Sequence, residues 1–200
     1  MTDDSIFRLA ILVVMALFMP LAAYHRIRSN QTREKLDRRQ EGILILFGLR
    51  LGAIPMLVSF LAWMINPAWM EWAALPISNW LRWCGIAFFV ASGLLIVWTF
   101  QHLGKNLTDT VVTRKDHTLV MTGPYRYVRH PFYVSFALAV LGISLATANW
   151  FFLLAGAIPL AFIVARTPIE EAKLVERFGE DYRQYMRKVG RFVPRFRNTV

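Results

Sequence analysis

Residues 132–147, FYVSFALAVLGISLAT, and residues 151–165, FFLLAGAIPLAFIVA, are two apolar segments that only Ala148, Asn149 and Trp150 separate. A connection of three residues cannot carry the chain far, so helices on either side of it must turn back on each other. We therefore expect a tight antiparallel helical hairpin at residues 132–165. Its apolar character is typical of helices inside a membrane.

Three longer apolar blocks precede this hairpin. They are residues 6–24, 43–65 and 80–100, each near the roughly 20 residues that a bilayer-spanning helix needs. With the hairpin they predict an all-α, multi-pass membrane protein with five transmembrane helices, in one domain over residues 1–200. The composition agrees, because 56% of the residues are hydrophobic and 18% are charged. The first block follows two aspartates rather than a basic segment, so we expect a retained helix and not a signal peptide.

The basic residues lie in particular connections between the apolar blocks. Of the 23 Lys and Arg residues, six lie in residues 25–40, five in residues 101–130 and nine from residue 166 onward, whereas residues 66–79 have none. With five spans, the positive-inside rule places the N-terminus outside and the C-terminus in the cytosol, in the cell or inner membrane if the source is prokaryotic. The net charge of +10 thus reflects topology and attraction to a lipid bilayer, not nucleic-acid binding.

Metal and disulfide chemistry are not expected. Cys84 is the single cysteine, so no disulfide can form within the chain. The four histidines, at 25, 102, 117 and 130, lack the close spacing typical of a zinc site.

Two segments outside the apolar blocks have features of ordered structure. Residues 101–131 are the longest connection and are expected to form a structured cytosolic loop. At Thr167, the sequence TPIE resembles a capped helix start, with Pro168 in the first position and Glu170 closing a capping box. Apolar residues then recur at helical spacing, so residues 168–189 predict a C-terminal amphipathic helix on the membrane surface or over the loop.

The sequence GPYRYVRHPFY, residues 123–133, places polar side chains at the start of the fourth apolar block. Pro131 suits the first turn of a helix, which puts Arg129 and His130 at an N-terminal end whose dipole favours an anion. Arg129 can also bind a carboxylate or phosphate with two parallel hydrogen bonds. Nearby aromatic faces can stack on a base or hold a cation; they belong to Tyr125, Tyr127 and Tyr133.

An anion partner, a platform for a base and a surface that tolerates positive sulfur together fit S-adenosylmethionine. The alternative is that Arg129 and the tyrosines only anchor the helix at the membrane interface. Arg50, inside the second block, is expected to snorkel to the headgroups, with a functional role as the alternative, and Arg82, near the outer end of the third block, is expected to be an interfacial anchor.

A second group of polar residues follows the fifth block. Arg166 ends the fifth helix, four and five residues before Glu170 and Glu171, so all three lie within reach of one another. Glu170 has the capping role described above, whereas Glu171 can accept from a ribose hydroxyl or an amino group. Arg166 can orient a substrate carboxylate at the membrane rim, or it can be a snorkelling anchor.

These motifs resemble the signature of the isoprenylcysteine carboxyl methyltransferases and their prokaryotic relatives. The resemblance covers residues 103–194 and rests on three matches. They are the sequence at 123–133, the preceding His117-x-Leu119-Val120-x-x-Gly123, and Arg166-x-x-x-Glu170-Glu171 followed by Leu174, Phe178-Gly179, Tyr182 and Tyr185.

The resemblance implies an integral-membrane methyltransferase that uses S-adenosylmethionine without a Rossmann domain, with a lipophilic acceptor entering from the bilayer. It assigns Arg166 to the substrate carboxylate, and with Glu171 this residue forms the expected catalytic pair. We add Arg129, for its charge at the helix start, and Glu170, beside Glu171, to the expected cofactor contacts. The contacts that the resemblance itself implies are His117, Leu119, Val120, Gly123, Tyr125, His130, Pro131, Tyr133 and Glu171.

The acceptor is less well defined than the donor. Family members often have a Trp-Ser pair where this chain has Leu107-Thr108. A carboxylate acceptor is the expected one, because it is ionised and needs no general base. Phospholipid N-methyltransferases and small-thiol S-methyltransferases share related motifs and are the alternative within the enzyme class. A non-catalytic membrane scaffold or transporter subunit is a third possibility.

Overall fold

The computed structural model describes residues 3–30, 43–104 and 118–195. The expectation of an all-helical chain is confirmed for these ranges, which contain helices and no β-strand. His117, Leu107-Thr108 and the middle of the predicted loop lie outside them. The helices, in order, are α1 (Asp3–Asn30), α2 (Ile43–Ile65), the 3-10 helix η2 (Pro67–Ala73), α3 (Asn79–Leu103), the 3-10 helix η4 (Gly123–Arg126), α4 (Pro131–Ala146), α5 (Trp150–Phe178) and α6 (Glu180–Lys188).

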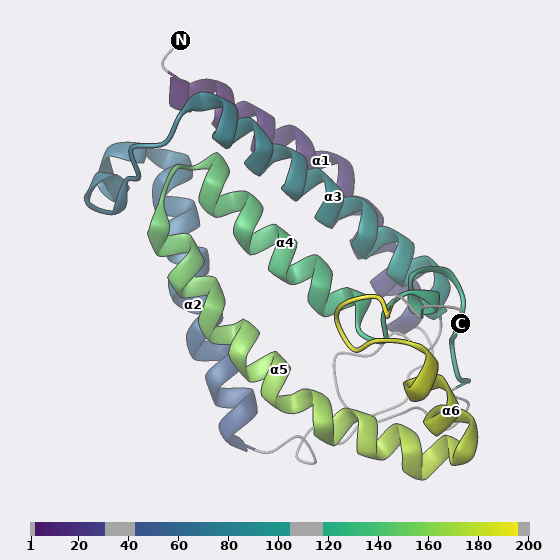
Figure 1. Ribbon diagram of the computed structural model, residues 1–200. Coiled ribbons are helices and arrows are strands. Elements are labelled where there is room, and N and C mark those ends of the chain that lie inside the picture. The colour runs from purple at the N-terminus through teal and green to yellow at the C-terminus, as the bar shows by residue number, and fades with distance from the viewer. Residues whose placement is uncertain (1–2, 31–42, 105–117, 196–200) are drawn as a thin grey trace.

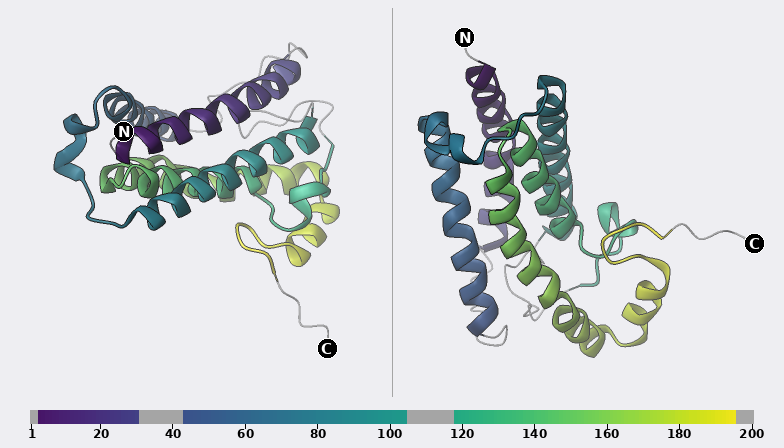
Figure 2. Two further views of the ribbon diagram at one scale, coloured as in Figure 1. Left: turned by 90° about the horizontal axis from the view of Figure 1, so that it is seen from above. Right: turned by 60° about the vertical axis from the view of Figure 1, so that its left-hand side comes forward.

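The long helices pack as a bundle in which α3 contacts α1 and α4, and α5 contacts α4 and α2 (Figure 1). The predicted hairpin is present, because α4 ends at Ala146 and α5 begins at Trp150 and runs back beside it. Asn149 caps α5 by accepting a hydrogen bond of 3.0 Å from the backbone N–H of Phe151. In Figure 2, α6 and residues 189–195 project from one end of this bundle.

Three described helices are long and apolar enough to cross a membrane: Asp4–Arg28, Asn79–Leu103 and Trp150–Phe178. Two more apolar stretches, Gly52–Ile65 within α2 and Pro131–Ala146, are shorter than a full span. The apolar helices are thus where the sequence predicts them. The count of five spans and the orientation of the termini stay predictions.

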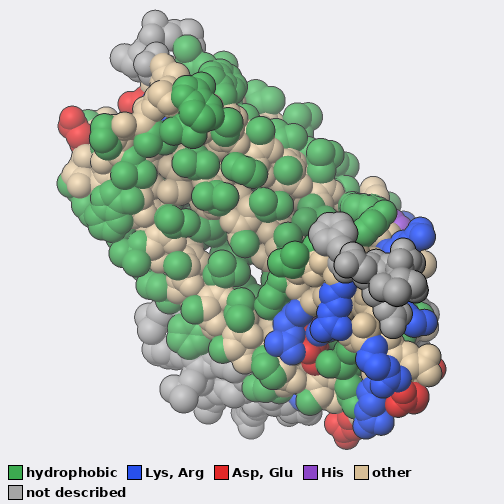
Figure 3. All heavy atoms as spheres, in the orientation of Figure 1, with side chains coloured by type: hydrophobic (Ala, Val, Ile, Leu, Met, Phe, Trp, Pro, Cys, Tyr) green, Lys and Arg blue, Asp and Glu red, His purple; other side chains and the backbone are tan. Residues whose placement is uncertain are grey.

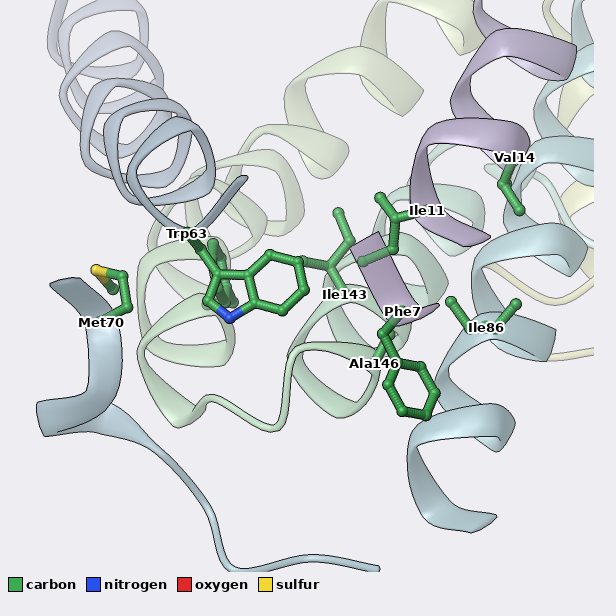
Figure 4. Packing of buried hydrophobic residues seen from close by; sticks show 9 residues of the cluster. Phe7, Ile11, Val14, Trp63, Met70, Ile86, Ile143 and Ala146 are labelled. Carbon is green, nitrogen blue, oxygen red and sulfur yellow. The ribbon is translucent and has the colours of Figure 1, made fainter. Parts of the chain in front are cut away.

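The hydrophobic core lies at the end of the bundle where α4 turns into α5. Trp63 of α2 and Ile143 of α4 meet there, and Phe7 and Ile11 of α1 approach from the other side (Figure 4). Phe152, at the start of α5, is fully buried in the same cluster. The turn between α4 and α5 is therefore fixed by packing from every neighbouring helix.

Helices α3 and α4 approach each other closely. A Cβ atom added at Gly142 of α4 would lie 2.7 Å from the backbone nitrogen of Phe89 in α3, so only glycine fits there. About two helical turns nearer the start of α4, the hydroxyl of Ser92 donates to the carbonyl of Ser135 at 2.8 Å, and the hydroxyl of Ser135 donates to the carbonyl of Ser92 at 3.0 Å. These contacts fix the first turns of α4, which carry the motif residues.

The predicted helix start at Thr167 is wrong. Helix α5 continues through Thr167 and Pro168 to Phe178, and the buried hydroxyl of Thr167 donates to the carbonyl of Ile163 at 3.1 Å. A threonine inside a helix can satisfy its hydroxyl in this way, so the capping signal is not decisive. The chain breaks instead at Gly179, whose φ of 56° suits glycine, and the predicted helix 168–189 is the end of α5 followed by α6.

The anchoring role expected for Arg82 is also wrong. Its side chain is buried, and its guanidinium forms an ion pair of 2.7 Å with Asp4. Its Nε donates to the carbonyl of Ala146 at 3.0 Å, and its Cζ lies 3.9 Å from the centre of the Phe7 ring. Arg82 therefore ties α1 and α3 to the end of α4.

Candidate functional site

The motif at 123–133 forms a compact turn before α4. Gly123 begins η4 with φ of 59°, and the ring of His102 lies where a side chain at position 123 would project. The hydroxyl of Tyr185 in α6 donates to the carbonyl of Tyr125 at 2.6 Å, which joins this turn to the C-terminal helix. Burial raises the pKa of Tyr125, so this tyrosine is a neutral phenol.

Glu171 of α5 is the centre of a buried ionic cluster. Its carboxylate is 3% exposed, and its Oε1 accepts from Arg129 Nε at 2.9 Å and lies 2.8 Å from Arg129 Nη2. His130 Nε2 lies 3.1 Å from the same oxygen. Arg191 completes the set, with Nη2 2.5 Å from Oε2 and Nε 3.2 Å from Oε1. Three basic side chains thus converge on one carboxylate, and the hydrogen bond to Glu171 raises the pKa of Arg191.

All three guanidinium nitrogens of Arg129 contact acceptors of the protein. Besides Glu171, its Nη1 donates to the carbonyls of Met186, at 3.1 Å, and Val189 at the end of α6. The sequence analysis expects Arg129 to pair with an anionic group of a bound cofactor; in the structure its guanidinium is paired with the protein's own Glu171 and with the end of α6 instead. Arg129 therefore joins α4, α5 and α6.

A second, linked set of polar groups lies beside this cluster. The hydroxyl of Tyr133 donates to Glu170 Oε2 at 2.6 Å and accepts from Arg166 Nη2 at 3.0 Å. His130 stacks on Tyr133 with ring centres 5.2 Å apart and nearly parallel planes, and its Nδ1 lies 3.9 Å from Glu170 Oε2. The carboxylate of Glu170 is 26% exposed, so it is more accessible than that of Glu171.

The structure brings together most of the predicted site residues from segments about 40 positions apart. Leu119 and Val120 lie half-buried in the segment that leads to η4, and His117 is outside the described residues. The cluster described above contains Arg129, His130, Tyr133, Arg166, Glu170 and Glu171. Pro131 lies beside it at the start of α4, and Tyr125 lies in η4.

The residues that follow α6 also contact the cluster, and they were not predicted from the sequence. The backbone N–H of Arg129 donates to the carbonyl of Gly190 at 2.9 Å, and that of His130 donates to the carbonyl of Arg191 at 3.1 Å. The ring of Phe192 lies 5.8 Å from that of His130. No local pattern distinguishes Arg191 from the other basic residues near the C-terminus; only its pairing with Glu171 does.

This end of the molecule is strongly charged, whereas the rest of the visible face is largely hydrophobic (Figure 3). Lys and Arg side chains gather there over α6 and the segment that follows it. Within the described ranges, no group of three His, Cys, Asp or Glu side chains could hold a metal ion.

Comparison with known proteins gives the chain a family context. Protein-S-isoprenylcysteine O-methyltransferase of Schizosaccharomyces pombe is 39% identical over 94 residues, which cover 46% of this chain and 40% of the relative. Methanethiol S-methyltransferase 1 of Bradyrhizobium diazoefficiens is 36% identical over 70 residues, which cover 35% of this chain and 24% of the relative. The chain therefore spans less than half the length of either relative.

A solved structure has a related fold. The eukaryotic intramembrane Ras methyltransferase ICMT (isoprenylcysteine carboxyl methyltransferase) superposes with a TM-score of 0.55 at 26% identity, covering 72% of this chain and 51% of that one. With the apolar helices, this likeness identifies an integral membrane protein. A family model described as Phospholipid methyltransferase matches residues 80–181, just over half of the chain. The chain therefore belongs to the phospholipid methyltransferase family, and its relatives confirm the predicted likeness to the isoprenylcysteine carboxyl methyltransferases.

Proposed function

We propose that this protein is an integral-membrane methyltransferase that uses S-adenosylmethionine to methylate a carboxylate on a lipophilic, prenylated substrate. One observation carries the proposal. The residues that match the isoprenylcysteine carboxyl methyltransferase signature, far apart in the sequence, fold into a single charged cluster at one end of an apolar bundle. The reaction class follows the similar proteins, which are isoprenylcysteine methyltransferases.

The side chains in this cluster suit the proposed methyl donor. The partly exposed carboxylate of Glu170 can accept hydrogen bonds from amino or hydroxyl groups. The half-buried ring of Phe192 packs against the buried rings of Tyr133 and His130 and provides aromatic surface beside it for a base or a sulfonium. Glu171 is bound by three basic side chains, so we assign it the role of holding the cluster together and Glu170 that of the accessible ligand.

In the proposed reaction Arg166 positions the acceptor. S-adenosylmethionine supplies a methyl group on positive sulfur; the carbon–sulfur bond breaks as a carbon–oxygen bond forms, giving S-adenosylhomocysteine and a methyl ester. The guanidinium of Arg166 is already oriented by the hydroxyl of Tyr133 and can bind the acceptor carboxylate. Orientation in a site shielded from water supplies much of the rate, and no proton has to be removed.

Methylation of a phospholipid amine or a small thiol is the second candidate. The description of the family model and the methanethiol S-methyltransferase relative favour it. Such acceptors need a general base, and both ring nitrogens of His130 already face carboxylates, at 3.1 Å and 3.9 Å. This geometry favours the carboxylate acceptor.

We place the charged cluster on the cytosolic side, with the N-terminus outside, and the acceptor reaching it from the bilayer. The basic side chains around α6 support this orientation, because basic segments stay on the cytosolic side.

The test is incubation of the purified protein with S-adenosylmethionine labelled in the methyl group and a membrane extract. Mild base releases label from a methyl ester as methanol, whereas N-methyl and S-methyl groups are stable to it. We expect base-labile label. Base-stable label would assign an amine or thiol acceptor, and failure to bind S-adenosylhomocysteine would refute the methyltransferase proposal.

A further inference from the structure

We propose that residues 190–193, named here the C-terminal strap, position the methyl-donor site, and that Arg191 fastens the strap. The inference rests on the proposed methyl transfer and adds a positioning residue to it. The strap follows α6 and returns to the start of α4, as Figure 1 shows at the yellow end of the chain.

The backbone of the strap pairs with the residues that lead into α4. Val128 and Gly190 form a parallel bridge, and the N–H groups of Arg129 and His130 donate to the carbonyls of Gly190 and Arg191. These two N–H groups stand immediately before Pro131, at the helix start where the sequence predicted an anion. The strap therefore closes this helix end and fixes the backbone that carries His130.

The side chains of the strap contact both halves of the site. Arg191 makes two hydrogen bonds to Glu171 of α5, at 2.5 Å and 3.2 Å. Phe192 lies against both members of the stacked ring pair, 5.8 Å from the ring of His130 and 6.4 Å from that of Tyr133. The strap thus joins α5 to the aromatic surface that we assign to the donor.

Arg191 differs from Arg129 in a way that makes its contribution separable from folding. The side chain of Arg129 is 5% exposed and also binds the end of α6, so the fold depends on it. The side chain of Arg191 is 41% exposed, and Glu171 keeps Arg129 and His130 when Arg191 is removed. Loss of Arg191 should therefore loosen the strap and leave the bundle intact.

The experiment compares wild type, Arg191→Gln, Arg191→Lys and the control Arg183→Gln, all as full-length protein in lipid nanodiscs. Arg183 is a matched control because it is an exposed arginine of the same region whose ion pair, 3.7 Å to Glu180, lies outside the cluster. Two quantities are measured: hydrogen exchange of the backbone amides at 129 and 130 without ligand, and kcat and KM for S-adenosylmethionine.

For Arg191→Gln we expect exchange at 129 and 130 to be about tenfold faster, because these amides lose the strap that protects them. We expect KM for S-adenosylmethionine to rise about tenfold, with kcat within about threefold of wild type, because the lost contact positions the donor and does not act on the reacting atoms. Arg191→Lys should lie between Arg191→Gln and wild type, since lysine keeps the charge without the paired hydrogen bonds.

If hydrogen exchange of the amides at 129 and 130 is the same in Arg191→Gln as in wild type, the proposal that Arg191 fastens the strap is wrong, whatever the activity. A fall in kcat at unchanged KM would overturn the positioning role and place Arg191 among the reacting groups. If wild type binds no S-adenosylhomocysteine, the proposed function fails and the donor-positioning role fails with it. In that case exchange still decides whether Arg191 fastens the strap.

Discussion

Replacing Arg129 with alanine should strongly destabilise the protein, because Arg129 joins three helices. Its guanidinium binds Glu171, which is 3% exposed, and the carbonyls of Met186 and Val189 at the end of α6. In the Arg129→Ala variant the buried carboxylate of Glu171 loses one of its three basic partners, and the part-buried carbonyls of Met186 and Val189 lose a donor. Removing one partner of a buried ion pair typically costs about 3–5 kcal/mol. Arg191 and His130 still reach Glu171, so we expect the lower part of this range.

A loss of about 3 kcal/mol corresponds to a fall in Tm of about 6–12 °C for a chain of this size. The assay is thermal unfolding of the detergent-solubilised protein, followed with a dye that fluoresces on reaction with a thiol. The chain suits this assay because Cys84 is its single cysteine. Cys84 lies half-buried in α3 and becomes accessible when the bundle opens.

Arg183→Ala is the control, because its ion pair with Glu180 is exposed on both sides and surface pairs of this kind contribute little. We expect its Tm to stay within about 2 °C of wild type. If the Tm of Arg129→Ala also lies within about 2 °C of wild type, Arg129 is not the structural link described above. The assignment of the cluster around Glu171 is then wrong.

Three further predictions concern the site and the bundle. Arg166→Gln should abolish methyl transfer while S-adenosylhomocysteine still binds; loss of binding, measured by calorimetry, would refute its role toward the acceptor. Gly142→Leu should cost about 3 kcal/mol in the thermal assay, because the new side chain meets the backbone of Phe89 in α3. Arg82→Met should lower Tm more than Asp4→Asn, since the side chain of Arg82 is 7% exposed and that of Asp4 is 43% exposed; the reverse order would contradict the buried role of Arg82.

The hairpin and the grouping of the motif residues could be predicted because local constraints decide them. Three residues between two apolar segments leave little choice but a tight turn, and Asn149 caps the helix that follows. Arg166 and Glu170 are only four residues apart, so their proximity also follows from spacing, although the single helix that carries both was not predicted. Their partner Tyr133 comes from another helix, and the family resemblance, not the spacing, indicated that the two segments meet.

The missed features depend on contacts between distant segments. Thr167 has the same sequence context whether it caps a helix or lies inside one, and the packing of α5 decides the outcome. Arg82 resembles an interfacial anchor until Asp4 of α1 is placed beside it. Arg191 is 20 residues from Glu171 in the sequence, and the break at Gly179 is what lets α6 turn the chain back.

A comparison of two acceptors decides whether the protein transfers the methyl group to a lipophilic carboxylate. The purified protein in nanodiscs is given labelled S-adenosylmethionine and N-acetyl-S-farnesylcysteine, or the same compound with its carboxylate converted to an amide. We predict a base-labile methyl ester with the acid and no labelled product with the amide. Equal labelling of both compounds, or labelling only of the amines of bilayer phospholipids, would contradict the account.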